Sequence, residues 1–285
     1  FRTEFLYLDR EQEPNEDEQM AIYQAITQMI SPHPLIIRLL DIGGDKPLSF
    51  MSSLSDNLQP ENNPFLGLRG IRLLLKYPEL LKTQLRAILR ASFGQNIKIL
   101  LPMISSLNEV RKFKEIMHNV KADLASNNIP FLDHIELGIM IEVPAAVAIA
   151  DQLAKEVDFF SIGTNDLTQY IMASDRTNPQ VSELSDAFEP AVLRMIQQTI
   201  MAAHNGNILV TVCGELASSP LATAILLGLG VDELSLTPPA IPGIKSKIAQ
   251  LNLSETQAIA SFVLTLDTAA DVKKYLKNMI PPSPP

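Results

Sequence analysis

Residues 159–170 read Phe-Phe-Ser-Ile-Gly-Thr-Asn-Asp-Leu-Thr-Gln-Tyr, an apolar β-type segment that leads directly into a helix with a polar start. Extended segments alternate in the same way with helical ones along most of the chain. This alternation is typical of a parallel sheet, because a crossover helix must separate one parallel strand from the next. We predict eight strands, at residues 2–7, 35–41, 66–69, 97–102, 135–142, 159–163, 208–213 and 233–236.

Eight strands predict an α/β fold, a (β/α)8 TIM barrel, over residues 1–280. An open doubly wound sheet more often has about five to seven strands and a glycine-rich turn after the first strand, and no such turn follows residues 2–7. The Pro-Pro-Ser-Pro-Pro tail at 281–285 cannot continue a helix, and we expect it to lie outside the barrel.

Two predicted helices have clear start signals. Asn15 with Glu18 and Ser106 with Glu109 have the spacing of capping boxes. Apolar residues then recur at helical spacing, and we expect them to face the core. They are Ile22, Ile26, Met29 and Ile30 in the first helix, and Val110, Phe113, Met117, Val120 and Leu124 in the second. Residues 52–64 have no period and predict a loop.

The composition limits the classes of function. Hydrophobic residues make up 46% of the 285 and charged residues 19%, which indicates a globular protein. A net charge of −9 argues against nucleic-acid binding, and no apolar run is long enough to cross a membrane, so we expect a cytoplasmic location. The single Cys213 excludes an internal disulfide, and the scattered histidines favour oxygen ligands for any metal. The chain starts within a predicted strand, and we interpret it as part of a longer protein.

Carboxylates follow two neighbouring predicted strands. Glu142 ends the strand at 135–142, and Asp166 follows the strand at 159–163. Active sites of (β/α)8 barrels lie at the carboxyl ends of the strands, and Mg²⁺ binds one or two carboxylates together with water and substrate phosphate. The alternative is that Asn165 or Asp166 only caps the helix that follows.

Basic residues also gather at predicted strand ends and in the loops after them. Such a set suits a small polyanionic ligand, because guanidinium groups bind phosphate and carboxylate in a bidentate manner. Arg38 lies inside an apolar run, where it could instead form a structural ion pair with Asp41 or Glu4, and surface salt bridges remain the alternative for Arg69 and Arg176. The set consists of Arg2, Arg38, Lys46, Arg69 and Arg176.

Cys213 ends the predicted strand at 208–213. A lone cysteine is usually a small buried apolar residue. At a strand end, beside arginines and a metal, it could act as a proton donor or a nucleophile. Both interpretations stay open on these grounds.

Together, the motifs resemble Enzyme I-type phosphotransferases of the PEP-utilising superfamily, which act on phosphoenolpyruvate, and the resemblance covers nearly the whole chain. The motifs occur in the family's order. They are Arg-Thr-Glu-Phe-Leu at 2–6, Asp-Ile-Gly-Gly-Asp-Lys at 41–46, Asn-Pro-Phe-Leu-Gly-Leu-Arg-Gly-Ile-Arg at 63–72, Glu-Val-Pro-Ala at 142–145, Ile-Gly-Thr-Asn-Asp-Leu-Thr-Gln-Tyr at 162–170, Asp-Arg at 175–176 and Cys-Gly-Glu-Leu-Ala at 213–217.

The resemblance implies a role for each matching residue. Glu142 and Asp166 would hold Mg²⁺, Arg69 would orient the ligand, and Cys213 would protonate the enolate as pyruvate forms. The remaining residues would bind the substrate, mostly through its phosphate. They are Arg2, Arg38, Lys46, Asn165, Asp166 and Arg176.

The resemblance also implies partners. A phosphohistidine domain precedes the barrel in this family and docks a small phosphocarrier protein. A homodimer would form through the barrel, with 218–221 and 236–244 as candidate interface loops. Leu68 replaces a usual Trp, and the loop after Lys46 looks longer, so the sugar, nitrogen-linked and fusion branches all stay open. A magnesium-dependent lyase or aldolase and a phosphoenolpyruvate sensor are the alternatives.

Overall fold

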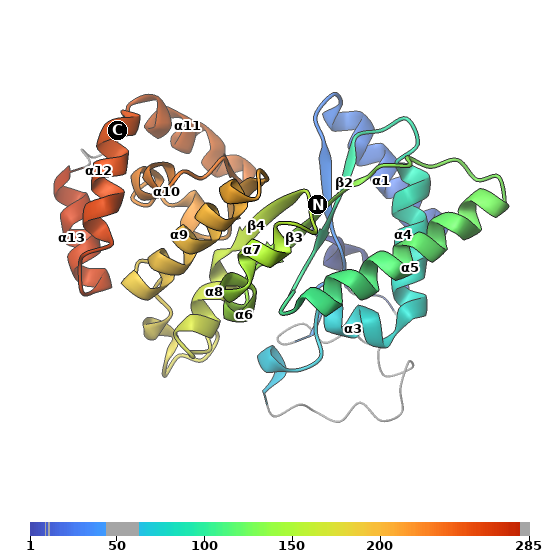
Figure 1. Ribbon diagram of the computed structural model, residues 1–285, viewed down its shortest axis with the longest axis horizontal. Coiled ribbons are helices and arrows are strands. Elements are labelled where there is room, and N and C mark those ends of the chain that lie inside the picture. Colours follow the sequence, from blue (N-terminus) through green and yellow to red (C-terminus); the bar gives the residue numbers. More distant parts are fainter. Residues whose placement is uncertain (9, 11, 44–62, 280–285) are drawn as a thin grey trace. The chain divides into compact units, whose positions relative to one another are not determined.

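The computed structural model describes residues 1–8, 10, 12–43 and 63–279 (Figure 1). The chain divides into two compact units, Phe1–Ile139 and Met140–Pro285, which we call the N-terminal and the C-terminal unit. Lys46 and the tail at 281–285 lie outside the described residues, as does all but the end of the loop predicted at 52–64. The described helices include none that is both long enough and apolar enough to cross a membrane.

The N-terminal unit contains parallel strands with helices between them. Strand β1 pairs with β2, and β2 pairs with the start of β3, so that Leu35 lies beside Ile97 and Ile99 beside Leu137. The elements are η1 (Thr3–Leu6), α1 (Glu16–Ile30), β1 (Leu35–Arg38), η2 (Pro64–Leu66), α3 (Ile71–Lys76), α4 (Pro78–Ala91), β2 (Ile97–Leu101), α5 (Leu107–Ser126) and β3 (Glu136–Ile141), the last of which ends in the C-terminal unit.

The C-terminal unit continues the same pattern. Strand β4 pairs with β5 in parallel, with Gly163 beside Cys213, and β5 pairs with β6. The elements are α6 (Pro144–Ala148), α7 (Ala150–Leu153), β4 (Phe159–Gly163), α8 (Thr164–Ile171), η3 (Ser182–Leu184), α9 (Pro190–Asn205), β5 (Leu209–Cys213), η4 (Leu216–Ser218), α10 (Thr223–Leu229), β6 (Glu233–Leu234), η5 (Pro238–Ala240), α11 (Ile241–Ala249), α12 (Leu253–Val263) and α13 (Ala269–Met279).

The predicted fold class is confirmed. Parallel strands alternate with helices and follow one another in chain order, as in a (β/α)8 barrel, with six strands in the described residues where we predicted eight. Those six agree with predicted strands to within a few residues, and β4 agrees at both ends.

Two predicted strands are wrong. Residues 2–7 form only a single bridge, between Arg2 and Arg38, before the 3-10 helix η1 begins. This turn buries Glu4, whose carboxylate pairs with the Arg38 guanidinium. Residues 66–69 also form no strand, because Pro64 starts the 3-10 helix η2 and Gly70 adopts a φ of +55°.

Both predicted capping boxes are present, at Asn15 with Glu18 and at Ser106 with Glu109. The buried face expected for α5 is confirmed except at Met117, which is half-buried. The buried face expected for α1 is wrong. Met29 is 84% exposed, and Ile22, Ile26 and Ile30 are only half-buried. Helix α1 instead buries Gln19, Tyr23 and Thr27.

These three polar groups can be buried because each makes a hydrogen bond. Tyr23 donates to Gln19 Oε1 at 3.0 Å, Gln19 Nε2 donates to the Pro14 carbonyl at 2.9 Å, and Thr27 Oγ1 donates to the Tyr23 carbonyl at 2.7 Å. Tyr7 adds a longer bond of 3.4 Å to the same Gln19 oxygen. The buried face of α1 therefore carries hydrogen-bonded polar side chains, where the sequence predicted isoleucines and Met29.

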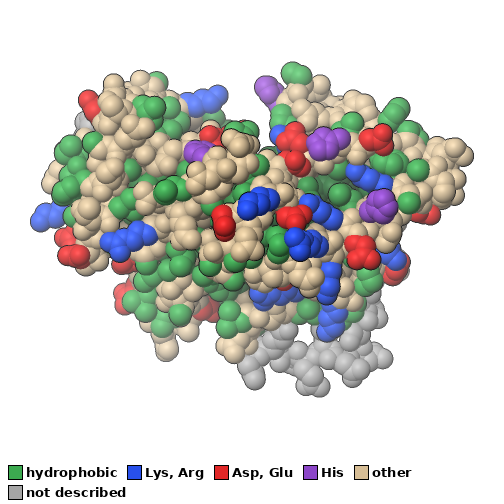
Figure 2. Space-filling model, in the orientation of Figure 1, with side chains coloured by type: hydrophobic (Ala, Val, Ile, Leu, Met, Phe, Trp, Pro, Cys, Tyr) green, Lys and Arg blue, Asp and Glu red, His purple; other side chains and the backbone are tan. Residues whose placement is uncertain are grey.

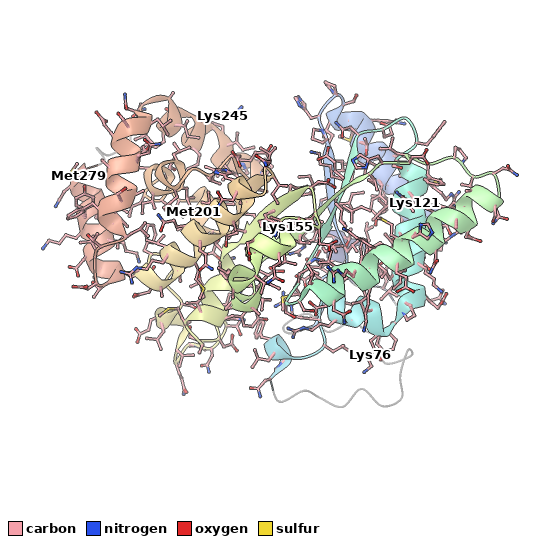
Figure 3. All side chains as sticks on the ribbon, in the orientation of Figure 1. Lys76, Lys121, Lys155, Met201, Lys245 and Met279 are labelled. Carbon is pink, nitrogen blue, oxygen red and sulfur yellow. The ribbon has the colours of Figure 1, made fainter. Side chains whose placement is uncertain are left out.

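Helix α9 shows the more usual amphipathic arrangement. Val192, Leu193 and Ile196 are buried, whereas Met201, labelled in Figure 3, is 57% exposed. On the face of the molecule drawn in Figure 2, Lys and Arg side chains lie among Asp and Glu side chains.

Candidate functional site

In the N-terminal unit, Arg38 lies at the end of β1 and forms two ion pairs. Its guanidinium pairs with the Glu4 carboxylate, and Nη1 lies 3.3 Å from Oδ2 of Asp41. Both ion pairs that the sequence suggested as alternatives are therefore present. The acidic partners are nearly inaccessible, with exposed side-chain fractions of 4% and 2%, so two carboxylates hold the guanidinium in place.

Arg69 shares Asp41 with Arg38. Its Nε donates to Oδ1 at 3.3 Å and its Nη2 to Oδ2 at 3.0 Å, which is a bidentate pair. Because Arg69 is only 6% exposed, its salt bridge is buried, and the alternative of a surface salt bridge at this residue is wrong. A chain of alternating charges thus runs from Glu4 through Arg38 and Asp41 to Arg69.

Arg2 joins this cluster through the backbone. It forms a parallel bridge with Arg38, and its guanidinium lies 5.3 Å from the centre of the Phe5 ring. The N-terminal unit thus brings together three of the predicted basic residues, Arg2, Arg38 and Arg69.

In the C-terminal unit, Glu142 directly follows β3 and is fully buried. It packs across Gly163, the last residue of β4. A Cβ atom at Gly163 would lie 2.7 Å from Glu142 Oε2 and 2.9 Å from Glu142 Cβ, closer than real contacts allow. The glycine leaves the space that this carboxylate fills.

Helix α8 begins at the end of β4 and carries Asn165 and Asp166 in its first turn. The helix is capped at Gly163 without any side-chain cap bond, so the prediction that Asn165 or Asp166 caps it is wrong. Asn165 Oδ1 instead accepts from the Glu215 backbone N–H at 3.0 Å, and its Nδ2 donates to Glu215 Oε1 at 3.5 Å. Asp166 is 8% exposed.

Cys213 ends β5 and is half-buried. Its thiol donates to the Ile162 carbonyl at 3.3 Å and accepts from Ser161 Oγ at 3.6 Å. Thr164 Oγ1 donates to the Cys213 carbonyl at 2.7 Å, so the start of α8 is tied to the end of β5. The thiol therefore lies in a polar setting, which differs from that of a cysteine that only fills an apolar core.

The strand ends of this unit approach each other through glycines. Gly214 has a φ of +92°, and a Cβ atom there would lie 2.4 Å from Thr164 Oγ1. Together with Gly163, it lets Glu142, Asn165 and Cys213 occupy adjoining strand ends.

Arg176 follows α8 in a loop, and its backbone N–H donates to Gln169 Oε1 at 3.0 Å. The side chain is half-buried, and its Nε is inaccessible to solvent and has no hydrogen-bond partner among the residues described. Lys46, the remaining predicted basic residue, lies outside the described residues.

In the chemistry of their side chains, two of the residues present suit a magnesium ion. Carboxylates are ligands that Mg²⁺ prefers, and a buried carboxylate beside Gly163 and a nearly buried Asp166 in the following helix turn provide two of them. Among the described residues, no group of three or more His, Cys, Asp and Glu side chains could hold a metal.

The sequence interpretation missed several residues that shape these sites. Gly163 and Gly214 were visible as glycines at strand ends, a position that often marks a close approach of backbone and side chain. Gln169 and Glu215 lie within the motifs at 162–170 and 213–217, but the sequence gave them no role, because their partners are known only once the chain is folded.

Comparison with known proteins places these observations in a family. Residues 1–253 match the family model of the PEP-utilising enzyme, PEP-binding domain. A phosphoenolpyruvate-protein phosphotransferase from Bacillus sp. (strain S) is 46% identical over 278 residues, which cover 98% of this chain and 47% of that protein. A multiphosphoryl transfer protein from Rhodobacter capsulatus is 45% identical over 95% of this chain and 32% of its own length.

The chain thus spans about half the length or less of these curated relatives. Among solved structures, a citrate lyase from Burkholderia xenovorans LB400 matches with a TM-score of 0.50 and 14% identity, covering 98% of this chain and 93% of its own. This likeness concerns the fold alone. The match of the family model over most of the chain, with the strand-end residues in place, shows that this chain belongs to the PEP-binding domain family of PEP-utilising enzymes.

Proposed function

We propose that this chain binds phosphoenolpyruvate with Mg²⁺ and supports transfer of the phosphoryl group to a histidine of a separate domain, which releases pyruvate. The protein would thus act as an Enzyme I-type phosphoenolpyruvate-protein phosphotransferase. The observation that carries this proposal is the family match over residues 1–253, which includes every predicted strand-end residue. The names of the relatives support the reaction.

The basic residues bind the substrate in this proposal. Arg2, Arg38 and Arg176 hold the phosphate together with Lys46 and Asn165, and Arg69 orients the ligand. The bidentate Arg69 pair and the two ion pairs of Arg38 support these roles, because a guanidinium that is already fixed loses little side-chain entropy when it binds an anion. Phosphoryl transfer requires mainly such positioning and charge stabilisation.

Glu142 and Asp166 hold the magnesium ion in this proposal. When bound, Mg²⁺ would neutralise negative charge on the phosphate and the enolate oxygen. Asn165 precedes Asp166 in the first turn of α8, and its two bonds to Glu215 support a fixed orientation of that turn.

Cys213 supplies a proton in this proposal. As the phosphorus–oxygen bond of the substrate breaks and a phosphorus–nitrogen bond forms at the histidine, the electron pair of the broken bond stays on oxygen and leaves the enolate of pyruvate. Its methylene carbon takes the proton of the Cys213 thiol, and the thiolate regains a proton from solvent. The half-buried position of the thiol at the end of β5 supports this role.

The partners follow from the same assignment. They are a domain with a phosphorylated histidine, a small phosphocarrier protein of the sugar or the nitrogen branch, and a second copy of the chain in a homodimer. Residues 1–280 form the phosphoenolpyruvate-binding domain in this proposal, and the protein works in the cytoplasm. The relatives that are about twice as long support a further domain.

Calorimetry tests the proposal directly. Phosphoenolpyruvate is titrated into the purified protein with Mg²⁺ and with a chelator, for the wild type and for Glu142→Gln. We expect wild-type binding only with Mg²⁺, and affinity lower by more than about tenfold in the variant, because an amide is a poorer ligand for Mg²⁺ than a carboxylate.

Glu136→Gln is the matched control. Glu136 begins the same strand that Glu142 follows, and it pairs with Lys98 Nζ at 2.7 Å. It should bind the substrate as the wild type does. Equal affinity with chelator and with Mg²⁺ would contradict the metal assignment, and no wild-type binding under either condition would contradict the proposed function.

A further inference from the structure

Gln169 makes two contacts with the loop that carries Arg176. Its side-chain Oε1 accepts from the Arg176 backbone N–H at 3.0 Å, and its own carbonyl accepts from the Ser174 N–H at 3.1 Å. Gln169 is only 4% exposed, and its bond to the Arg176 N–H is partly buried. A single residue of α8 thus binds the backbone N–H groups of both Ser174 and Arg176.

Further contacts within the loop around Arg176 also fix its conformation. Ala173 adopts a φ of +50°, which is unusual for a residue with a side chain, and it turns the chain away from α8. Ser174 Oγ lies 2.9 Å from Ser185 Oγ, and Asp175 Oδ1 accepts from the Thr177 N–H at 2.8 Å. Within this loop, Gln169 provides the side-chain contact to the Arg176 backbone itself.

The Arg176 side chain is prepared for a ligand. Its Nε is inaccessible to solvent and has no hydrogen-bond partner within the described part of the chain. When an anion binds such an unpartnered guanidinium donor, the new hydrogen bond adds most to the affinity if the arginine backbone is already fixed. The position of that backbone depends on Gln169.

Gln169 also links this arginine to the metal carboxylate. Asp166 and Gln169 are three residues apart in α8, and residues at this spacing are neighbours on a helix surface. One short helix therefore carries a proposed magnesium ligand and the residue that holds Arg176. A change at Gln169 would move the arginine relative to Asp166 while it leaves Asp166 in place.

We propose that Gln169 is a positioning residue, which sets Arg176 for the phosphate of the substrate. This inference rests on the proposed function. Gln169 touches no reacting atom, and it acts only through the backbone of Arg176. It should therefore affect ligands that carry a phosphate and spare those that bind only to the metal.

A double-mutant cycle tests this role. Gln169→Met keeps the length of the side chain and removes the acceptor. We expect it to weaken binding of phosphoenolpyruvate about tenfold in Mg²⁺, as for one buried donor left without its partner, and to leave binding of oxalate, a ligand without phosphate, unchanged. In an Arg176→Ala background, Gln169→Met should have no further effect on phosphoenolpyruvate.

Gln198→Met is the matched control. Gln198 lies on α9 of the same unit, and its Nε2 donates to the Val147 carbonyl at 3.3 Å. This variant should bind both ligands as the wild type does. Equal weakening of oxalate and phosphoenolpyruvate by Gln169→Met, or full weakening in the Arg176→Ala background, would overturn the positioning role.

If Gln169→Met folds poorly, amide hydrogen exchange on a second variant, Gln169→Glu, tests the same inference. Gln169→Glu keeps an acceptor oxygen, so the Arg176 amide should exchange as slowly as in the wild type, and fast exchange in this variant would overturn the inference. A wild-type protein that fails to bind phosphoenolpyruvate overturns the proposed function and this inference with it. Wild-type affinity in a folded Gln169→Met overturns this inference alone.

Discussion

Cys213 can be a proton donor or a structural residue, and the two roles differ in what its removal affects. As a donor, Cys213→Ala should leave phosphoenolpyruvate binding nearly intact, because arginines and metal would hold the anion under the proposed function. Pyruvate formation with the domain that carries the unphosphorylated acceptor histidine should slow by roughly 10² to 10⁴. As a structural group, the thiol would contribute on the order of 1 kcal/mol to stability through its contacts with Ile162 and Ser161.

Turnover and melting temperature, measured on the same Cys213→Ala protein, separate these roles. A slow reaction with a nearly unchanged melting temperature supports the donor. A normal turnover number with a lower melting temperature would show that the cysteine is structural.

At the scale of single residues, the sequence predicted which residues lie at strand ends better than it predicted the contacts that they make. Glu142, Asp166 and Cys213 could be placed because strand ends and polar residues are both visible along the chain. The partner of Arg38 could not be chosen, since Glu4 and Asp41 are equally plausible by spacing, and both proved to bind it. The burial of Arg69 was missed because its partner Asp41 is 28 residues away.

At the scale of elements, α10 and α12 pack side by side in the C-terminal unit (Figure 1). Gly228 makes this possible, since a Cβ atom there would lie 2.0 Å from the Thr256 carbonyl oxygen of α12. Gly228→Ala must push the helices apart, and we expect it to lower the free energy of unfolding by about 1 to 3 kcal/mol, as measured by urea denaturation.

Gly243→Ala is the control for this prediction. Gly243 lies within α11, and a Cβ atom there would meet nothing within 4 Å. Alanine should stabilise this helix by about 0.5 to 1 kcal/mol. Equal effects of the two substitutions would show that the contact between α10 and α12 is not the cause.

Elements were predictable where one local rule decides them. Strand β4 was correct at both ends because Gly163 stops an apolar run, and both capping boxes follow from residues three apart. The first predicted strand failed because burial of Glu4 against Arg38 favours a 3-10 turn. Helix α1 failed because hydrogen bonds allow Tyr23 and Gln19 to be buried, which hydrophobic spacing does not reveal.

At the scale of the whole molecule, buried tyrosines should make stability depend on pH in alkaline solution. Burial raises the pKa of both Tyr7 and Tyr23 above the ordinary value. Unfolded tyrosines lose their protons near pH 10, whereas these two stay neutral in the fold. Their contribution is therefore complete below about pH 10 and is lost as the pH rises from there toward the raised pKa.

Tyr23→Phe tests this dependence. The variant should lose about 1 kcal/mol at neutral pH with the bond to Gln19, yet the decline of its stability above pH 10 should be shallower by up to about 1.4 kcal/mol per pH unit. Melting temperatures from pH 8 to about 11 measure the slope. Tyr275→Phe, at a half-buried tyrosine that packs on Phe262, is the control, and an equally shallow decline in it would contradict the assignment.

The order of the strands has a consequence for how the chain folds during synthesis. Each strand pairs with the strand that precedes it in the sequence, from β1 to β6. When a new strand leaves the ribosome, its neighbour is already available, and the chain to be closed is only the segment between two consecutive strands, such as α5 between β2 and β3. Contacts of short sequence separation form fastest, and nascent chains fold from the N-terminus onward. The pairing of β1 with β2 and of β2 with β3 can thus be complete before β5 has been translated, which limits the time for which an unpaired strand edge is open to other nascent chains.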